Sequence, residues 1–414
     1  MRPEIHRRPD CRLCGGRELG LAFALAPSPP ANAFASAQRR GGQQRKFPLD
    51  LFFCRQCAHL QLLDVVDPRI LFEEYVYVSS TSPVFVDHFR RLADEILHRF
   101  PAPAGSLTLE IGSNDGALLR FFQQAGMTVL GVDPAVKIAA QATESGIPTL
   151  NAFFTPTLAR EIRSDQGAAH YLLANNVCAH IDDLGAVLDG VRALLAPDGV
   201  FVFEVSYLAD VVEKTLFDTI YHEHLDYHSV KPLIPFFRRH GLELIETWRV
   251  DSHGGSLRGV AQRAEGGRPV GASVGELVAL EEAMGLDRLE TFLQFAQRIE
   301  TRKEQLTTLL RQWKQEGKSI AGYGAPAKAA TLMHHFGLGP EMIDFIVDDS
   351  PWKQGLFSPG LHIPILPSSA IASEKPDAIV ILAWNFAQPL LNKLADYRQS
   401  GGKCVVPLPE VTVY

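Results

Sequence analysis

The stretch Glu110-Ile-Gly-Ser-Asn-Asp-Gly116 decides the fold of this 414-residue chain. It begins within a strand-like run, Leu107-Thr-Leu-Glu-Ile, and a helix is expected to start directly after it. Gly112 and Gly116 let the backbone approach a ligand at this strand-to-helix turn. The next strand along the chain leads into Asp133, whose carboxylate is suited to accept hydrogen bonds from ribose hydroxyls. These features predict a nucleotide-type ligand at the carboxyl edge of a parallel sheet.

Strand-like and helix-like segments continue to alternate on both sides of this stretch. A helix with apolar residues at helical spacing precedes it from Pro83 to Phe100, and further strands are expected after it. Such alternation is typical of a doubly wound α/β domain with a parallel sheet covered by helices. A second α/β unit starts at Lys318. The expected strands, in chain order, are 107–111, 128–132, 171–174, 199–205, 319–322, 342–347 and 378–383.

The spacing of the first loop distinguishes between cofactors. A Gly-x-Gly-x-x-Gly loop holds the pyrophosphate of NAD, whereas the acidic-x-Gly-x-x-x-Gly spacing of 110–116 resembles the loop of class I methyltransferases. The turn Leu195-Ala-Pro-Asp-Gly199, which leads into a later strand, also resembles the methyltransferase pattern. S-adenosylmethionine is therefore favoured over NAD, and a dehydrogenase is the alternative. The residues expected to bind the cofactor are Glu110, Gly112, Asn114, Asp115, Gly116, Asp133, and Asn175 and Asn176 at the end of the fourth strand.

Four of the six cysteines form two Cys-x-x-Cys pairs, Cys11 with Cys14 and Cys54 with Cys57. In a reducing compartment such pairs bind a metal more often than they form disulfides. Four thiolates close the tetrahedral shell of a structural zinc ion and leave no open position for a catalytic water. Roughly the first 65 residues contain too little periodic apolar sequence for a core of their own, so we expect the metal to hold this module together. Nearby His59 is not expected to be a ligand.

The composition excludes several classes of protein. Hydrophobic residues make up 46% and charged residues 21%, as in folded globular proteins, and the net charge of −7 gives the whole chain no attraction to nucleic acids or anionic membranes. No apolar run approaches the roughly 18 residues that span a bilayer, and the start Met-Arg-Pro-Glu-Ile-His lacks the apolar part of a signal peptide. We therefore expect a cytoplasmic protein, a monomer or homodimer, that binds neither nucleic acid nor a membrane.

The segment Tyr221-His-Glu-His224 places a phenol, two imidazoles and a carboxylate in four consecutive residues. Such a cluster suits the methylation of carbon, which needs a base to remove a proton beside a ketone and a group to stabilise the resulting oxyanion. An imidazole is well matched to proton abstraction near neutral pH. His180, after the fourth strand, is expected near the cofactor. The alternatives are a structural network, a surface loop, or a catalytic metal at His222 and His224.

Five motifs taken together carry a family resemblance. They are the paired Cys-x-x-Cys module, Glu-Ile-Gly-Ser-Asn-Asp-Gly (110–116), Asn-Asn-Val-Cys-Ala-His-Ile (175–181), Tyr-His-Glu-His-Leu-Asp-Tyr (221–227) and Gly-Tyr-Gly-Ala-Pro-Ala-Lys (322–328). In this order, over essentially the whole chain, they resemble the deoxysugar C-methyltransferase family, which makes branched-chain sugars for antibiotics and surface polysaccharides. The resemblance implies a zinc-binding N-terminal domain, a methyltransferase domain that uses S-adenosylmethionine, and a Rossmann-like C-terminal domain. It also implies a nucleotide-linked keto-sugar as substrate.

The resemblance implies roles for individual residues as well. His224 would be the general base. Beside it would lie its orienting or oxyanion-side partners Tyr221, Glu223 and His180. The family has a similar tyrosine and serine segment near its active site, which in this chain is Glu-Tyr-Val-Tyr-Val-Ser-Ser-Thr-Ser with Tyr75 and Tyr77. Packing between domains is an equally good role for these two tyrosines.

In the C-terminal half, Gly322-Tyr-Gly-Ala-Pro-Ala-Lys328 follows a strand and opens a helix. Backbone amides at such a helix start can receive a diphosphate, to which a lysine adds a point charge. The motif alone would suit NAD nearly as well, but the resemblance implies that this domain holds the nucleotide-sugar through Tyr323, Lys328 and Asp348. Ala329-Ala-Thr departs from the Gly-Asn-Thr that follows the lysine in close relatives, which leaves the sugar and its carrier open.

We therefore expect four parts: a zinc-binding module at 1–70, a methyltransferase domain with a class I Rossmann-like parallel sheet at 71–270, a helical connector at 271–315 and a second Rossmann-like domain at 316–414. The expected function is C-methylation beside the ketone of a nucleotide-linked keto-deoxysugar, through an enolate. The alternatives are an NAD-dependent oxidoreductase, O- or N-methylation by the same domains, and a non-enzymatic zinc adaptor or nucleic-acid binder. The acid–base cluster and the acidic composition disfavour the adaptor.

Overall fold

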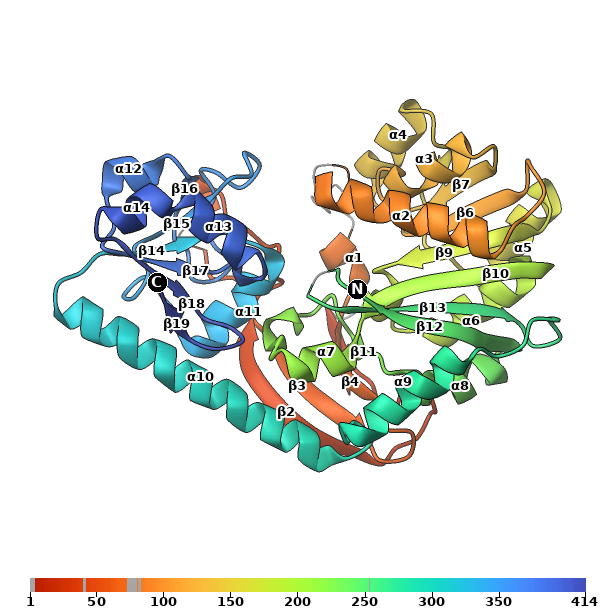
Figure 1. The fold of residues 1–414 in the computed structure, drawn as a ribbon, viewed down its shortest axis with the longest axis horizontal. Coiled ribbons are helices and arrows are strands. Elements are labelled where there is room, and N and C mark those ends of the chain that lie inside the picture. Colours follow the sequence, from red (N-terminus) through yellow and green to blue (C-terminus); the bar gives the residue numbers. More distant parts are fainter. Residues whose placement is uncertain (1–3, 40–41, 73–79, 81–82, 253) are drawn as a thin grey trace.

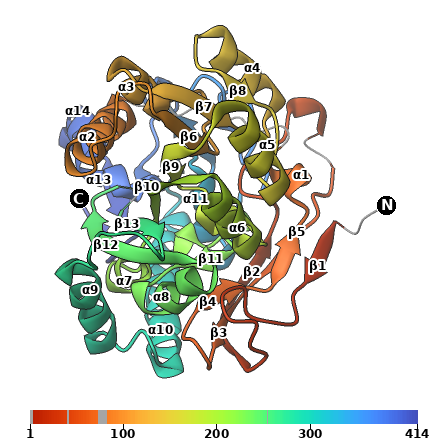
Figure 2. The ribbon, with the colours of Figure 1, turned by 90° about the vertical axis from the view of Figure 1, so that its right-hand side faces the viewer.

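The computed structural model describes residues 4–39, 42–72, 80, 83–252 and 254–414. Two α/β lobes lie side by side, and the 27-residue helix α10 (Leu289–Gln315) joins them and runs beneath the smaller lobe and the N-terminal strands (Figure 1). A smaller N-terminal sheet lies between α10 and the two lobes (Figures 1 and 2). The N-terminal sheet therefore packs against other parts of the chain on both of its sides.

The larger lobe is built on a seven-stranded sheet. Its strands, in spatial order, are β12 (Leu242–Val250), β13 (Ser256–Arg263), β10 (Leu195–Ser206), β9 (Ala169–Asn175), β6 (Leu107–Ile111), β7 (Thr128–Val132) and β8 (Thr149–Leu150). Strands β8, β7, β6, β9 and β10 are parallel, as the alternation of strands and helices predicts. At the other edge β13 runs antiparallel to both β10 and β12, which the sequence pattern did not predict. The short connection 251–255 leaves no room for a crossover, and so β12 and β13 pair as a hairpin.

Helices cover both faces of this sheet, and alternate residues of β9 serve the two faces. Tyr171 and Leu173 pack in one apolar cluster with α2 (Pro83–Arg99) and α3 (Ala117–Gln124). Leu172, which lies between them in the sequence, packs in a second apolar cluster on the opposite face, with α5 (Pro156–Gln166) and α6 (Leu184–Leu194). The other helices of this lobe and its surroundings are α1 (Pro68–Phe72), α4 (Val136–Glu144), α7 (Leu208–Glu213), α8 (Val230–Arg239) and α9 (Ala272–Ala283).

The smaller lobe is built on a six-stranded sheet of the same kind. In spatial order its strands are β16 (Ile365–Pro367), β15 (Phe345–Asp348), β14 (Ile320–Tyr323), β17 (Ala378–Ile381), β18 (Lys403–Val406) and β19 (Thr412–Val413). All neighbours are parallel except β19, which runs antiparallel to β18. The strand order reverses between β14 and β17, which is the point where such sheets bind ligands. The helices of this lobe are α11 (Ala327–Phe336), α12 (Ala370–Glu374), α13 (Ala387–Lys393) and α14 (Ala395–Gln399).

The N-terminal sheet includes one strand, β11, that comes from the larger lobe. Its order is β11 (Asp226–Tyr227), β4 (Leu60–Leu62), β3 (Phe47–Cys54) and β2 (Leu19–Ser28). A separate pair is formed by β1 (Ile5–Arg7) and β5 (Asp64–Val66). Strand β11 follows the segment 221–224 directly, so this sheet is attached to the predicted acid–base cluster.

The N-terminal module packs on α10, which the sequence analysis did not predict when it assigned the stability of the module to a metal. The ring of Phe23 lies 5.5 Å from that of Phe295, and the ring of Phe53 lies 5.5 Å from that of Phe292. The phenylalanines of α10 are buried, as are the strand residues that face them. The module therefore shares the main apolar core of the chain, and α10 is its partner as well as the predicted connector.

Within the described ranges, no helix combines the length and the apolar character that crossing a membrane requires.

Candidate active site

A cavity of about 2540 Å³ lies between the two lobes and the loop that joins β2 to β3 in the N-terminal module. Its walls come from the carboxyl ends of strands in both sheets, where open α/β folds bind ligands. A usual pocket for one small ligand has roughly 300–1,000 Å³, so this cavity has room for two. Its wall in the larger lobe includes the predicted cofactor residues Gly112, Asn114, Asp133, Asn175 and Asn176.

The first glycine loop depends on its two glycines. Gly112 and Gly116 have φ angles of 68° and 75°, which side chains rarely adopt. A Cβ atom at Gly112 would lie 2.7 Å from Cγ2 of Val177, and one at Gly116 would lie 2.7 Å from Cγ2 of Ile147. A larger residue at either position would therefore displace the loop that forms this part of the wall.

The Asp133 carboxylate holds the same loop from the neighbouring strand. Its Oδ2 accepts a hydrogen bond from the Asn114 backbone N–H at 2.8 Å, and its Oδ1 accepts one from the Ala135 backbone N–H at 2.8 Å. Burial raises the pKa of the Asp133 carboxyl group, and the two N–H donors oppose this rise. Beside the predicted contact with ribose, Asp133 thus fixes the shape of the loop.

Three predicted cofactor residues have buried polar atoms without a partner among the described residues: Oε2 of Glu110, Oδ1 of Asp115 and Nδ2 of Asn175. Burial, together with the nearby charges of Asp115 and Asp133, raises the pKa of Glu110 well above its usual range. Buried polar groups normally have a hydrogen-bond partner. A ligand with an ammonium group and several hydroxyl groups, such as S-adenosylmethionine, would supply donors to the oxygen atoms of these two carboxyl groups. The residues present therefore fit this cofactor.

His180, His224 and Tyr221 form a stack of rings on the cavity wall. The ring centroids of His180 and His224 lie 5.0 Å apart, and those of Tyr221 and His224 lie 4.1 Å apart. Nδ1 of His224 lies 2.7 Å from the backbone carbonyl oxygen of Thr219. Because a carbonyl only accepts hydrogen bonds, Nδ1 of the neutral ring carries the proton and Nε2 is the basic nitrogen. The ring is thus held in the tautomer that proton abstraction requires.

Two further contacts position this stack. The ring of Phe72, at the end of α1, stacks on His180 at 5.7 Å between centroids. Oε1 of Glu223 accepts a hydrogen bond from Nδ2 of Asn32 at 2.9 Å, and both residues line the cavity. Asn32 comes from the N-terminal module, and sequence reasoning missed it because no motif surrounds it. Tyr75 and Tyr77 lie outside the described residues.

His222 faces away from this cavity, although it lies between two residues of its wall in the sequence. It is 1% exposed, and its Nε2 is 3.2 Å from the carbonyl oxygen of Phe47. Burial lowers the pKa of His222 to about 4, so the ring is neutral at physiological pH. Among the described residues, the side chains that lie close enough together to hold a metal ion are the four cysteines of the N-terminal module. Neither His222 nor His224 is part of such a group.

Lys328 lines the cavity from the smaller lobe. Its Nζ lies 4.0 Å from the centroid of the Trp384 ring and 3.9 Å from Oδ2 of Asp218, and this oxygen accepts a hydrogen bond from Nε1 of Trp384 at 2.6 Å. Burial lowers the pKa of Lys328 and raises that of Asp218, while the attraction between the two charges opposes both shifts. Sequence reasoning missed Asp218 and Trp384 because both are far from Lys328 along the chain.

The other two predicted substrate residues, Tyr323 and Asp348, are buried and are not part of the cavity wall. The Tyr323 hydroxyl donates to Oδ2 of Asp349 at 3.2 Å. The Asp348 carboxylate accepts hydrogen bonds from the backbone N–H groups of Ala325 at 2.7 Å and Ser350 at 2.8 Å. Asp348 therefore fixes the second glycine loop from behind.

The four cysteines of the N-terminal module meet as predicted. Sγ of Cys11 lies 3.6 Å from Sγ of Cys57, and Sγ of Cys14 lies 3.5 Å from Sγ of Cys54. All four sulfur atoms lie within 4.8 Å of one another, and none is in a disulfide. A tetrahedral zinc ion with Zn–S bonds of about 2.3 Å would place its sulfur ligands about 3.8 Å apart. The four thiolates fit a closed structural zinc site.

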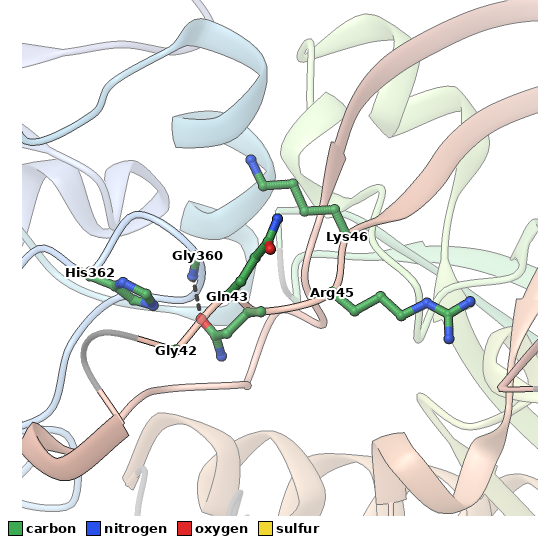
Figure 3. A pocket seen from close by; sticks show the side chains of 7 residues that line it. Gly42, Gln43, Arg45, Lys46, Gly360 and His362 are labelled. Carbon is green, nitrogen blue, oxygen red and sulfur yellow. Dashed lines mark hydrogen bonds between the residues drawn. The ribbon is translucent and has the colours of Figure 1, made fainter.

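A second cavity, of about 690 Å³, lies between the loop 42–46 and the turn with Gly360 and His362 (Figure 3). The backbone N–H of Gly360 donates to Oε1 of Gln44 at 2.5 Å. Arg45 extends away from His362 in this view (Figure 3). None of the predicted site residues that the structure describes is in this wall, whereas several of them line the larger cavity.

Known proteins resemble this chain along its length. Three family descriptions match successive parts of the chain: a zinc binding domain at 11–72, a methyltransferase domain at 85–247 and a C-methyltransferase C-terminal domain at 251–409. C-methyltransferase NovU of Streptomyces niveus is 38% identical over 404 residues, which make up 98% of this chain and 96% of that protein. Ubiquinone biosynthesis O-methyltransferase of Rhodopseudomonas palustris (strain HaA2) is 33% identical over 100 residues, 24% of this chain and 39% of that protein.

Solved structures resemble part of the chain. The PH0226 protein from Pyrococcus horikoshii OT3 covers 45% of this chain and 94% of its own length, with a TM-score of 0.37 and 14% identity. An S-adenosylmethionine-dependent methyltransferase from Clostridium acetobutylicum ATCC 824 covers 44% of this chain and 92% of its own length, with a TM-score of 0.36 and 13% identity.

The likeness to C-methyltransferase NovU runs through nearly the full length of both chains and includes all three parts of the fold. The chain therefore belongs to the C-methyltransferase family, as an S-adenosylmethionine-dependent enzyme with a zinc-binding N-terminal domain.

Proposed function

We propose that this enzyme methylates the carbon beside the ketone of a nucleotide-linked keto-deoxysugar, with His224 as the general base. The observation that carries the proposal is the 2.7 Å hydrogen bond from His224 Nδ1 to the Thr219 carbonyl oxygen, because it makes Nε2 the basic nitrogen. His224 lines the cavity shared by both lobes. Carbon methylation needs such a base, since a C–H proton must leave before the carbon can bond to the methyl group.

In the proposed reaction, Nε2 of His224 takes the proton from the carbon beside the ketone. The electron pair of that C–H bond forms the double bond of an enolate, whose oxygen takes up the negative charge. S-adenosylmethionine supplies an electrophilic methyl group when it is bound. The enolate carbon bonds to this methyl group as its bond to sulfur breaks, and the sulfur keeps that electron pair. The proton on His224 then passes to solvent.

The neighbours of His224 are assigned to placing the base and stabilising the oxyanion. Tyr221 and His180 stack on the ring and carry hydrogen-bond donors suited to an enolate oxygen. Glu223 holds the segment against Asn32. For Tyr75 and Tyr77 the proposal is the one that the family resemblance implies, a place near the active site.

For the cofactor, the glycine loop and the ends of β7 and β9 form the proposed site. Asp133 would accept hydrogen bonds from the ribose hydroxyls while it keeps its two backbone donors, since a carboxylate has about four acceptor positions. Glu110, Asp115 and Asn175, with buried atoms that have no partner among the described residues, would complete the contacts. Gly112, Gly116, Asn114 and Asn176 would shape the loops around the ligand.

For the nucleotide-sugar, the carboxyl end of the second sheet forms the proposed site. Lys328 would bind the diphosphate, with Tyr323 and Asp348 supporting the loop behind it. The volume of the cavity supports this division, because it exceeds what a single ligand fills.

Deuterium exchange tests the proposal without methyl transfer. Nucleotide-linked keto-deoxysugars deuterated beside the ketone would be incubated with enzyme in the absence of S-adenosylmethionine, and loss of deuterium would be followed by NMR. We expect the wild type to exchange and His224→Asn to exchange about 10²–10⁴-fold more slowly, while binding both ligands normally. His98→Asn, at an exposed position, is the matched control and is expected to behave as wild type.

A second measurement locates the product methyl group. With S-adenosylmethionine labelled in its methyl group, we expect the label on carbon. A label on oxygen, or a wild type that exchanges no deuterium, would reject the enolate mechanism. An exchange rate of His224→Asn equal to that of the wild type would reject His224 as the base.

A further inference from the structure

Two side chains of the zinc-binding domain reach the segments that carry the stacked histidines. Arg12 directly follows the zinc ligand Cys11, and His59 lies two residues after the ligand Cys57. Both side chains are 0% exposed. The reaction proposed above uses neither of them.

Arg12 holds the chain just beyond both histidines. Its Nε donates to Oδ1 of Asp182, two residues after His180, at 3.0 Å. Its Nη1 donates to the backbone carbonyl oxygen of Leu62 at 2.5 Å and to Oε1 of Gln61 at 3.2 Å. The same nitrogen makes a longer hydrogen bond of 3.4 Å to the backbone carbonyl oxygen of Leu225, the residue directly after His224. One guanidinium group thus fixes both segments relative to each other.

His59 holds the same region through Asp226. Its Nε2 lies 2.6 Å from Oδ1 of Asp226. The backbone carbonyl oxygen of His59 accepts a hydrogen bond from the N–H of Cys54 at 2.8 Å. The residue that binds Asp226 is therefore itself part of the turn that carries Cys54 and Cys57.

Backbone hydrogen bonds complete this junction. Strand β11, which begins at Asp226, pairs with β4 of the zinc-binding sheet. The N–H of Leu225 donates to the carbonyl oxygen of Ala179, directly before His180, at 2.7 Å. The cysteine turns, the segment of His224 and the segment of His180 thus form one hydrogen-bonded unit.

The charges at this junction are costly to bury. Nη1 of Arg12 lies 3.9 Å from Oδ1 of Asp226, and both side chains are 0% exposed. A buried ion pair of this kind adds little net stability, because desolvation opposes the attraction between the charges. It does favour one arrangement of the chain over others, which suits a segment that must present a base at a fixed place.

We propose that Arg12 and Asp226 are positioning residues that transmit the geometry of the zinc site to His224 and His180. The inference rests on the proposed role of His224 as base. The zinc site then takes no part in proton or methyl transfer, and it acts by keeping the base at the correct distance from the substrate carbon. A displacement of a catalytic group by 1 Å can lower a rate by about 10²-fold.

Hydrogen–deuterium exchange of the backbone tests the link without catalysis. The full-length protein would be compared with and without zinc after treatment with a chelator. We expect the peptides 178–182 and 219–228 to exchange on the order of tenfold faster without zinc, while the strands at 107–132 keep their rates. Unchanged exchange at 219–228 would overturn the inference. Loss of protection at 107–132 as well would also overturn it, because zinc would then support the whole lobe and not this junction.

Variants that retain zinc test the catalytic consequence. We expect Asp226→Asn and Arg12→Lys to bind one zinc ion and both ligands as the wild type does, with unchanged KM. Their kcat for methyl transfer should fall by about 10²-fold. Arg7→Gln, which removes an exposed arginine paired with Asp64 in the same domain, is the control and should keep the wild-type kcat.

The outcomes separate this inference from the proposed function. If both variants keep the wild-type kcat, or lose zinc together with activity, the positioning role is rejected while deuterium exchange by the wild type still supports the base. If the wild type exchanges no deuterium, the proposed mechanism fails, and with it the role of the junction in presenting a base.

Discussion

Asp133 and Asp348 make the same set of hydrogen bonds in the two lobes. Asp133 directly follows β7 and Asp348 ends β15, which are the second strands of the two sheets in chain order. Each carboxylate accepts one hydrogen bond from a backbone N–H of the glycine loop after the first strand. Each also accepts one from the backbone N–H two residues further along the chain, and all four distances are 2.7–2.8 Å. The two lobes thus present equivalent edges to one cavity. Because the edges belong to separate sheets, mutations should affect the two ligands separately.

Asp133→Ala should weaken the binding of S-adenosylmethionine by about 1–3 kcal/mol, since the ligand loses a charged acceptor and the loop loses its anchor. Isothermal titration calorimetry measures the change. Asp348→Ala is the matched control, because it removes the same hydrogen bonds in the other lobe, and it should leave this affinity unchanged. Equal losses in both variants would mean that the assignment of cofactor to the larger lobe is wrong.

Lys328→Met should raise the KM for the nucleotide-sugar about tenfold or more and leave S-adenosylmethionine affinity unchanged, because a charge-assisted hydrogen bond is worth about 1.5–3 kcal/mol. Asp218 can tolerate the loss of its partner by taking up a proton, since burial already raises its pKa. Steady-state kinetics and calorimetry measure the two effects. Lys393→Met, at a half-exposed site in the same lobe, is the control. A parallel loss of cofactor affinity would contradict the division of ligands.

Cys54→Ser should reduce the zinc content of the purified protein and lower its Tm, because three thiolates and a hydroxyl bind zinc more weakly than four thiolates. Metal analysis and thermal unfolding measure the two quantities. Cys404→Ser changes a buried cysteine of the smaller lobe and should retain a full equivalent of zinc. Less than half an equivalent in the wild type would count against the four-cysteine site.

The stability of the enzyme should fall in mild acid. Burial lowers the pKa of His222 and of His228 to about 4, below the ordinary value of 6.5. The unfolded chain therefore binds more protons between these values, and the free energy of unfolding decreases as the pH falls from 6.5 towards 4. Each of these histidines should lower the free energy of unfolding by about 2 kcal/mol as the pH falls from 6.5 to 5.

Chemical denaturation at pH 7 and pH 5 checks this dependence. His222→Gln should lose less stability than the wild type between the two values, because glutamine does not titrate. An identical loss in both proteins would show that His222 does not carry the effect.

The sequence predicted those parts of the fold and site that have a local pattern. The spacing of Gly112 and Gly116 indicated the cofactor loop, and the two Cys-x-x-Cys pairs indicated the cysteine cluster that the structure shows. Such signals are readable because the residues that act together are close along the chain. The roles of the residues around His224 and Lys328 remain predictions.

The parts that the sequence did not predict join residues that are far apart along the chain. Strand β11 has two residues, too few for a periodic pattern, and its partner β4 lies in the N-terminal module. The contact between Lys328 and Asp218 likewise depends on how the two lobes meet. The packing of β2 on α10 was missed because helix periodicity shows which side is apolar but not what covers that side.

The continuous helix α10 has a consequence for how this family can diversify. Its 27 residues span about 40 Å, and buried side chains occur along it from Phe292 to Trp313. Because α10 is one continuous helix that is packed along its length, we expect it to fix the distance between the two lobes. The distance between the proposed sites of the methyl donor and the methyl acceptor would then be fixed as well. Enzymes with this architecture would then adapt to substrates of different bulk by altering the rim of the cavity, while the distance across it stays the same.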